Sequence, residues 1–194
     1  TEIWRRWPMA GMPQAFSSRA EYDRLIEALV ATETIEDGTK IYWDLRPSAR
    51  YETVEFRVTD VCMTIDEAVM IAGLSRALAR TTHAEAMRNE PITHARPELL
   101  RAAKWRAARY GLDADLIDIE SARAVPAHDL VEKLLARLRP DLEEQGEWDE
   151  INSLTREVLT RGNGATRQRA AYAQNGRLED VVDLIVAETV KGNA

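Results

Sequence analysis

Hydrophobic and polar residues alternate in two neighbouring segments, residues 42–47 and residues 53–58. Successive side chains of a β-strand point to opposite faces, so this alternation predicts two strands, and the short connection favours an antiparallel hairpin. One face of the predicted hairpin is apolar and carries Ile41, Trp43, Leu45, Val54, Phe56 and Val58. The opposite face carries Tyr42, Asp44, Arg46, Thr53, Glu55 and Arg57.

The polar face of this predicted hairpin combines carboxylates with arginines. Asp44, Arg46, Glu55 and Arg57 can hold a cation and an anion side by side, and metal-bound phosphate is a ligand of that kind. A solvated sheet face with cross-strand salt bridges has the same pattern. The residues alone leave both interpretations open.

The remaining N-terminal half is predicted to be a loop and helices. Residues 1–17 lack a clear period and indicate an ordered loop. Capping boxes at Ser18 and Thr64 begin two helices. The first extends to about Val30; the second is apolar on nearly all sides, which predicts a buried helix against the apolar face of the hairpin. Residues 83–97 indicate a connection with His83 and His94 at the surface.

The C-terminal part is predicted to be almost wholly helical. A helix runs from Pro97 to Tyr110 and ends at Gly111, and after a turn at residues 121–126 helical periodicity continues to about residue 190, with a break at residues 162–164. The fold class is therefore α+β. Two apolar stripes predict the core: Val131, Leu134, Leu135, Leu138 and Leu142, followed by Trp148, Ile151, Leu154 and Val158.

Composition and charge exclude several classes of function. The chain has 194 residues, a net charge of −7 and no apolar run of membrane-spanning length. The negative charge argues against binding to nucleic acid or to an anionic membrane. The single cysteine, Cys62, cannot form an internal disulfide, and no signal-peptide pattern begins the sequence, so we expect a reducing, cytoplasmic location.

Basic residues outside the hairpin are further candidates for contact with an anion. The helix at residues 97–110 carries Lys104, Arg106 and Arg109, which either form a solvated face or reach an anionic substrate. Arg167, next to the glycine-containing break, is a candidate for contact with an anion or a partner chain.

The motifs around the hairpin resemble those of the type 2 glutamate–cysteine ligases, also called carboxylate–amine ligases. Four blocks carry the resemblance, in the family's order: Trp7-Pro8-Met9-Ala10-Gly11-Met12-Pro13-Gln14-Ala15-Phe16; Tyr42-Trp43-Asp44-Leu45-Arg46-Pro47-Ser48 with Thr53-Val54-Glu55-Phe56-Arg57-Val58-Thr59-Asp60; Lys104-Trp105-Arg106-Ala107-Ala108-Arg109-Tyr110-Gly111-Leu112-Asp113; and Gly162-Asn163-Gly164-Ala165-Thr166-Arg167-Gln168. The chain departs from the family at Ala103, where an asparagine is usual, and at Tyr42, where a tryptophan is usual.

This resemblance implies a glutamine-synthetase-like fold and an ATP- and Mg²⁺-dependent ligase. Such an enzyme joins the side-chain carboxylate of glutamate to cysteine or another amine through a γ-glutamyl phosphate. Carried over to this chain, Glu55 is a metal ligand, Arg57 and Arg46 are catalytic, and Asp44, Tyr42, Lys104, Arg106, Arg109 and Arg167 contact substrate or ATP.

The resemblance covers only the C-terminal half of the family's length. We therefore expect one domain, 1–194, with a loop, helix and catalytic hairpin in residues 1–62 and a helical region in residues 63–194. The N-terminal half would be a separate chain or a missing segment, and an open sheet edge suggests an oligomer. The alternative is a catalytically silent module of the same family that binds a ligand or forms a subunit interface.

Overall fold

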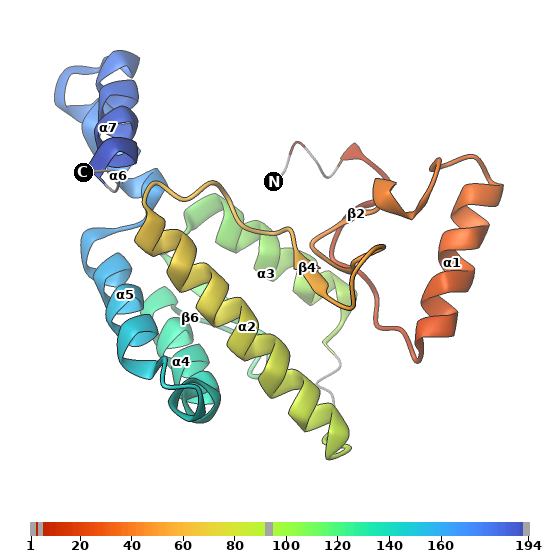
Figure 1. Ribbon diagram of the computed structural model, residues 1–194. Helices are drawn as coiled ribbons and strands as arrows, with labels where there is room; N and C mark the ends of the chain where they lie inside the picture. The colour runs from red at the N-terminus through yellow and green to blue at the C-terminus, as the bar shows by residue number, and fades with distance from the viewer. Residues whose placement is uncertain (1–2, 4–5, 92–94, 192–194) are drawn as a thin grey trace. The chain divides into compact units, whose positions relative to one another are not determined.

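A computed structural model describes residues 3, 6–91 and 95–191 of the chain. It contains two compact units, Thr1–Asp60 and Val61–Ala194, each with its own internal contacts. The division lies close to the predicted change from hairpin to helical region, and whether the units act as one domain stays a prediction. Short strands, helices and a helical C-terminal region confirm the α+β class (Figure 1).

The first unit contains a helix and short strands. Helix α1 begins after Ser18, whose side chain accepts a hydrogen bond from the backbone N–H of Glu21, as the capping box predicts. The elements in chain order are β1 (Ala10–Gly11), α1 (Arg19–Ala31), the 3-10 turn η2 (Gly38–Lys40), β2 (Tyr42–Trp43), β3 (Leu45–Pro47) and β4 (Val54–Phe56).

The predicted hairpin is confirmed, with one correction. Strands β3 and β4 are antiparallel, and Arg46 lies opposite Glu55. The prediction of one continuous strand over residues 42–47 is wrong, because β2 pairs in parallel with β1 and only β3 pairs with β4. Asp44 lies between them: its N–H donates to the carbonyl of Gly11, and its carbonyl accepts from the N–H of Arg57.

An aromatic cluster forms part of the core of the first unit. The ring of Trp43 lies 5.8 Å from that of Phe16 and 6.1 Å from that of Tyr22, beside the fully buried Ile41. The predicted apolar face is only partly covered, because Leu45, Val54 and Val58 are exposed. A two-stranded sheet gives these side chains few neighbours.

The second unit is mostly helical. Its elements are α2 (Ile65–Met87), α3 (Pro97–Tyr110), β5 (Asp115–Asp118), β6 (Arg123–Pro126), α4 (Ala127–Glu144), α5 (Trp148–Arg161), α6 (Gly164–Asn175) and α7 (Leu178–Lys191). The second capping box is confirmed, since Thr64 accepts from the N–H of Glu67. Helix α2 is longer than predicted and includes His83; His94 lies outside the described residues. The turn predicted at residues 121–126 is too long, because Arg123–Pro126 form β6. The antiparallel hairpin β5–β6, with Leu116 opposite Val125, was not predicted.

The core of the second unit lies where α2, α4 and α5 meet. The predicted stripes are confirmed, since Leu138, Leu142 and Ile151 are buried together with Ala77 of α2. The prediction that α2 is buried on nearly all sides is wrong. Its buried apolar positions, Met70, Gly73 and Ala77, form one stripe, whereas Ile65 and Val69 are exposed.

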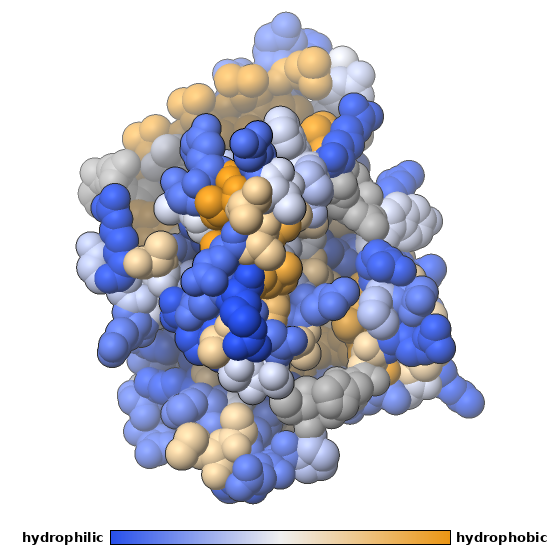
Figure 2. Space-filling model, turned by 90° about the vertical axis from the view of Figure 1, so that its right-hand side faces the viewer, coloured by the Kyte–Doolittle hydropathy of each residue, from blue (hydrophilic) through white to orange (hydrophobic). Residues whose placement is uncertain are grey.

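The exposed side of α1 is mixed in character. This helix, at the right in Figure 1, lies on the side of the molecule that faces the viewer in Figure 2, where blue side chains are interspersed with paler and orange ones. Arg19, Arg24 and Glu27 are among its exposed residues. In the part of the chain that the structure describes, no helix combines the length and the apolar character needed to cross a membrane.

Candidate functional site

Arg46 is the fixed centre of the charged residues on the β3–β4 hairpin. Its Nε and Nη2 atoms both lie 2.9 Å from Oε2 of Glu55, directly across the strand pair. Its Nη1 donates to the carbonyl oxygens of Thr39 and Ile41, each at 2.7 Å. The side chain is 11% exposed. A planar guanidinium with this many acceptors has one orientation, so Arg46 is held rigidly.

Glu55 also pairs with a second arginine, Arg57, which directly follows β4. Nη1 of Arg57 lies 3.3 Å from Oε2 of Glu55, and its guanidinium lies 5.6 Å from the centre of the Tyr42 ring. The hydrogen bond from Arg46, with the charge of both arginines, lowers the pKa of the Glu55 carboxyl below its usual value. The carboxylate is therefore ionised at neutral pH.

The structure thus brings five predicted site residues together in the first unit. Tyr42 and Arg57 stack, Arg46 and Glu55 pair, and the backbone of Asp44 accepts a hydrogen bond from that of Arg57. Arg57 is the more accessible arginine, with a side chain 36% exposed. The three charges of Arg46, Glu55 and Arg57 sum to a positive site, which suits an anion with oxygens in several directions.

The described residues do not by themselves fit a magnesium centre. Among them, no group of three or more His, Cys, Asp or Glu side chains lies close enough to hold a metal ion. Oε2 of Glu55 already accepts from two guanidinium groups, whose charge repels a cation. Mg²⁺ prefers six oxygen ligands, so oxygens from elsewhere are needed. The assignment of Glu55 as a metal ligand stays a prediction.

A cleft of about 300 Å³ lies beside Arg46 in the first unit. Its walls include Arg19, Tyr22 and Asp23 from α1 and Ser48 from the loop after β3. Arg19 pairs with Asp23 at 2.8 Å, so both signs of charge are present in its wall. The volume is at the lower end of the range for small-molecule sites. Sequence reasoning missed the cleft, because the contribution of α1 depends on tertiary packing.

The predicted basic residues of α3 lie in the second unit. The guanidinium groups of Arg106 and Arg109 lie 5.4 Å and 5.3 Å from the centre of the Tyr110 ring. Arg106 also donates to the carbonyl of Asp115 at the start of β5. Lys104 lies on the same helix. Contact between these residues and the substrate of the hairpin stays a prediction.

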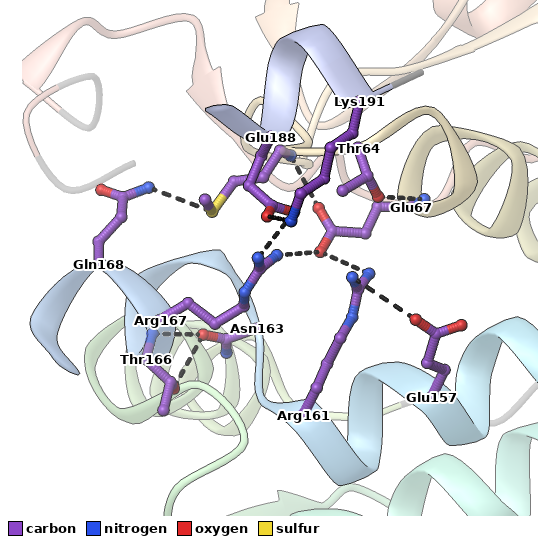
Figure 3. Close-up of polar contacts among 11 residues, drawn as sticks. Thr64, Glu67, Glu157, Arg161, Asn163, Thr166, Arg167, Gln168, Glu188 and Lys191 are labelled. Carbon is purple, nitrogen blue, oxygen red and sulfur yellow. Dashed lines mark hydrogen bonds and ion pairs between the residues drawn. The ribbon is translucent and has the colours of Figure 1, made fainter. Parts of the chain in front are cut away.

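Arg167 belongs to a network of charges between α2, α5, α6 and α7 (Figure 3). Its Nη2 lies 2.7 Å from Glu188, and its Nη1 lies 4.0 Å from Glu67. Arg161 also pairs with Glu67, at 3.0 Å. Both carboxylates are buried, and hydrogen bonds from Lys191 and Arg167 lower the pKa of Glu188 to about 2. Arg167 therefore ties helices together, and its contact with an anion or a partner chain stays a prediction.

Sequence reasoning missed the roles of Glu67 and Glu188 in this network. The capping box at Thr64 predicts only the start of α2, but the carboxylate of Glu67, three residues later, accepts both from the N–H of Met63 and from Arg161. Glu188 follows Val181 and Leu184 along one side of α7. A carboxylate within an apolar stripe is a signal for a buried ion pair, because charged groups are rarely buried without a partner.

Comparison of the sequence with known proteins identifies the family to which the chain belongs. The model of glutamate–cysteine ligase family 2 (GCS2) matches residues 1–184. The chain belongs to this family, which confirms the resemblance found in its motifs.

Its relatives include proteins from several bacteria. A protein of Frankia alni named "Putative glutamate–cysteine ligase 2-2" is 46% identical over 97% of this chain, which covers 49% of that protein. Proteins with similar names from Mycolicibacterium vanbaalenii and Rhodopirellula baltica are 41% and 39% identical, and the chain covers 52% and 50% of their lengths. The chain thus spans about half the length of these curated relatives.

Proposed function

We propose that this chain supplies the phosphoryl-binding hairpin of an ATP-dependent carboxylate–amine ligase. The observation that carries the proposal is the cross-strand pair of Arg46 and Glu55 with Arg57 beside it, in a chain that belongs to the glutamate–cysteine ligase family. The reaction joins the γ-carboxylate of glutamate to cysteine or another amine through a γ-glutamyl phosphate.

The two arginines have different parts in this proposal. Transfer of a phosphoryl group is accelerated mainly by fixed positive charge around its oxygens. Arg57 is accessible and lies 3.3 Å from its carboxylate partner, so it can turn toward a phosphoryl oxygen. Arg46 has all of its described contacts within the hairpin unit and positions Glu55. Arg57 is thus the proposed catalytic contact and Arg46 the proposed positioning residue.

The remaining parts of the proposal concern partners and location. The substrates are ATP, glutamate and an amine, and the acceptor amine is not defined by these residues. Because the chain spans about half of its relatives, we propose that the rest of the ligase, as the same or a separate polypeptide, supplies further oxygen ligands for Mg²⁺. Lys104, Arg106, Arg109 and Arg167 stay candidates for substrate contact, in a cytoplasmic, oligomeric enzyme.

The test uses this chain together with the part of the Frankia alni relative that it does not match, produced as a second polypeptide. ADP release that depends on glutamate and an amine is expected, with a loss of about 100-fold or more in Arg57→Ala and Glu55→Ala. Arg50→Ala, an exposed arginine in the loop of the same hairpin, is the matched control and should retain activity. Wild-type ADP release in both site variants would refute the proposal.

The second candidate is a catalytically silent module of the same family. It is favoured by the lack of a group of three metal-ligating side chains among the described residues. Calorimetry of the two-polypeptide sample with ATP and Mg²⁺ separates the candidates, since a ligase must bind nucleotide with the metal. Absence of nucleotide binding, with tight binding of the two polypeptides to each other, would favour the silent module.

A further inference from the structure

Helix α7 has apolar residues on two sides, and only one of these sides is covered by the rest of the chain. Val181, Leu184 and Glu188 follow one another along the less exposed side, and α7 packs against α6. The other side carries Leu178, Val182, Ile185, Val186 and Val190, which are 72%, 57%, 38%, 56% and 57% exposed. We call these five residues the open face of α7.

The open face is a continuous stripe. Leu178, Val182, Val186 and Val190 are spaced by four residues and form a row along the helix, and Ile185 lies beside this row. Continuous apolar stripes of this kind on a protein surface mark sites of interaction, whereas isolated exposed aliphatic side chains do not. On one flank of the row, Glu179 and Asp183 add negative charge.

The orientation of this stripe is fixed by the charged network of Figure 3. Glu188, on the opposite side of α7, accepts from Arg167 of α6 at 2.7 Å and from Lys191 at 2.6 Å. Arg167 in turn lies 4.0 Å from Glu67 of α2. Since the buried carboxylate pairs with Arg167 of α6, α7 cannot rotate to hide its open face without breaking the Arg167–Glu188 ion pair.

We propose that the open face of α7 docks onto the part of the ligase that lies outside this chain. The inference rests on the proposed function in one respect, that the chain works with the rest of a longer protein. The relatives from Frankia alni and Mycolicibacterium vanbaalenii named above match over 97% of the chain yet are about twice as long, so a polypeptide of similar size is available to cover the stripe. Its receiving surface is apolar, with basic residues beside Glu179 and Asp183.

The open face is too small for a second copy of this chain to be the partner that covers it. The open face consists of five side chains on a helix of 14 residues. A stable interface uses about 20–30 residues on each partner. The open face is too small to hold two copies together, but it suffices as one part of a larger contact within a single ligase.

The experiment places a cysteine at one position at a time. Val182→Cys and Val186→Cys report on the open face, and Ala136→Cys, at an exposed position of α4, is the matched control. All three are made in a Cys62→Ser background. The rate of alkylation by a maleimide is measured for the chain alone and after addition of the unmatched part of the Frankia alni relative.

The expected result is that alkylation at positions 182 and 186 slows by about tenfold or more in the presence of the second polypeptide, while position 136 is unchanged. Circular dichroism first establishes that the second polypeptide is folded. Three results would then overturn the proposal: no complex, equal rates at all three positions in the complex, or protection already present in the chain alone. If the chain alone is protected, analytical ultracentrifugation determines whether it is a dimer, in which case a second copy covers the open face.

This experiment distinguishes failure of the docking proposal from failure of the proposed ligase function. A complex that releases ADP in the presence of glutamate and amine but leaves positions 182 and 186 reactive overturns the docking alone. A complex that protects both positions without any turnover of ATP supports the docking and overturns the ligase function.

Discussion

Replacing Arg46 by alanine removes the side chain that joins the hairpin to the segment before it. The side chain is 11% exposed and pairs with Glu55, which is 33% exposed. Removing one partner of a buried ion pair costs about 3–5 kcal/mol, and exposed pairs are worth about 0–1 kcal/mol. Because Glu55 is partly exposed, we take an intermediate loss of about 2 kcal/mol in the free energy of unfolding. The carbonyls of Thr39 and Ile41 also lose their donor, which adds about 1 kcal/mol.

The expected total for Arg46→Ala is therefore about 3 kcal/mol in the free energy of unfolding of the first unit. For a unit of this size, that corresponds to a fall in Tm of about 12 °C or more. Near-ultraviolet circular dichroism is a suitable assay, because Trp43 packs against Phe16 and Tyr22. Arg50→Ala, in the exposed loop, is the control and should change stability by less than about 0.5 kcal/mol.

The pH dependence gives this prediction a second, independent check. The pKa of Glu55 is lowered in the folded chain from the ordinary 4.5. Its pairing therefore stabilises the fold fully above pH 4.5, and this contribution is lost as the pH falls through the lowered pKa. The difference between wild type and Arg46→Ala should shrink on acidification. Equal stability of Arg46→Ala and Arg50→Ala at pH 7 would refute the reasoning.

Two further predictions concern the second unit. Lowering of the Glu188 pKa from 4.5 to about 2 corresponds to roughly 3 kcal/mol of stability, present above pH 4.5 and lost as the pH falls through about 2. Urea unfolding of Glu188→Gln should show a loss of about 2–3 kcal/mol at pH 7 that disappears near pH 2; a constant difference would contradict this. In Gly73→Ala, the added Cβ lies 2.8 Å from Cγ1 of Ile151, so we expect a net loss of about 1–2 kcal/mol. Ile151→Val should restore part of that loss in the double variant, and strictly additive effects would argue against the clash.

Local signals in the sequence predicted the ends of the helices and the pairing of the hairpin. Ser18 and Thr64 cap their helices with the predicted hydrogen bonds, and Gly111 ends α3 with a positive φ of 58°. The opposition of Arg46 and Glu55 follows from the alternation of their strands. These features depend on residues close in sequence, which is why a pattern suffices to predict them.

Other features depend on contacts that no local pattern specifies. The turn between β5 and β6 contains no Gly, Pro or Asn, and Ala122 adopts a positive φ of 55°. Its stability comes instead from Asp118, which accepts from Ser121 and from the N–H of Glu120. Likewise, Glu67 and Arg161 are far apart in sequence, so their pairing depends on how α2 and α5 pack. Tertiary interactions of this kind explain the missed hairpin and the missed network.

The bend at Asp44 makes two distant backbone segments mechanically dependent on each other. The N–H of Asp44 donates a hydrogen bond to the carbonyl of Gly11, and the carbonyl of Asp44 accepts one from the N–H of Arg57. A ligand that displaces Arg57 therefore also acts on the segment containing β1, because both segments are hydrogen-bonded to the backbone of Asp44. Strain applied to either segment is shared through Asp44, so substitutions near Gly11 can change how firmly Arg57 is held without contacting it.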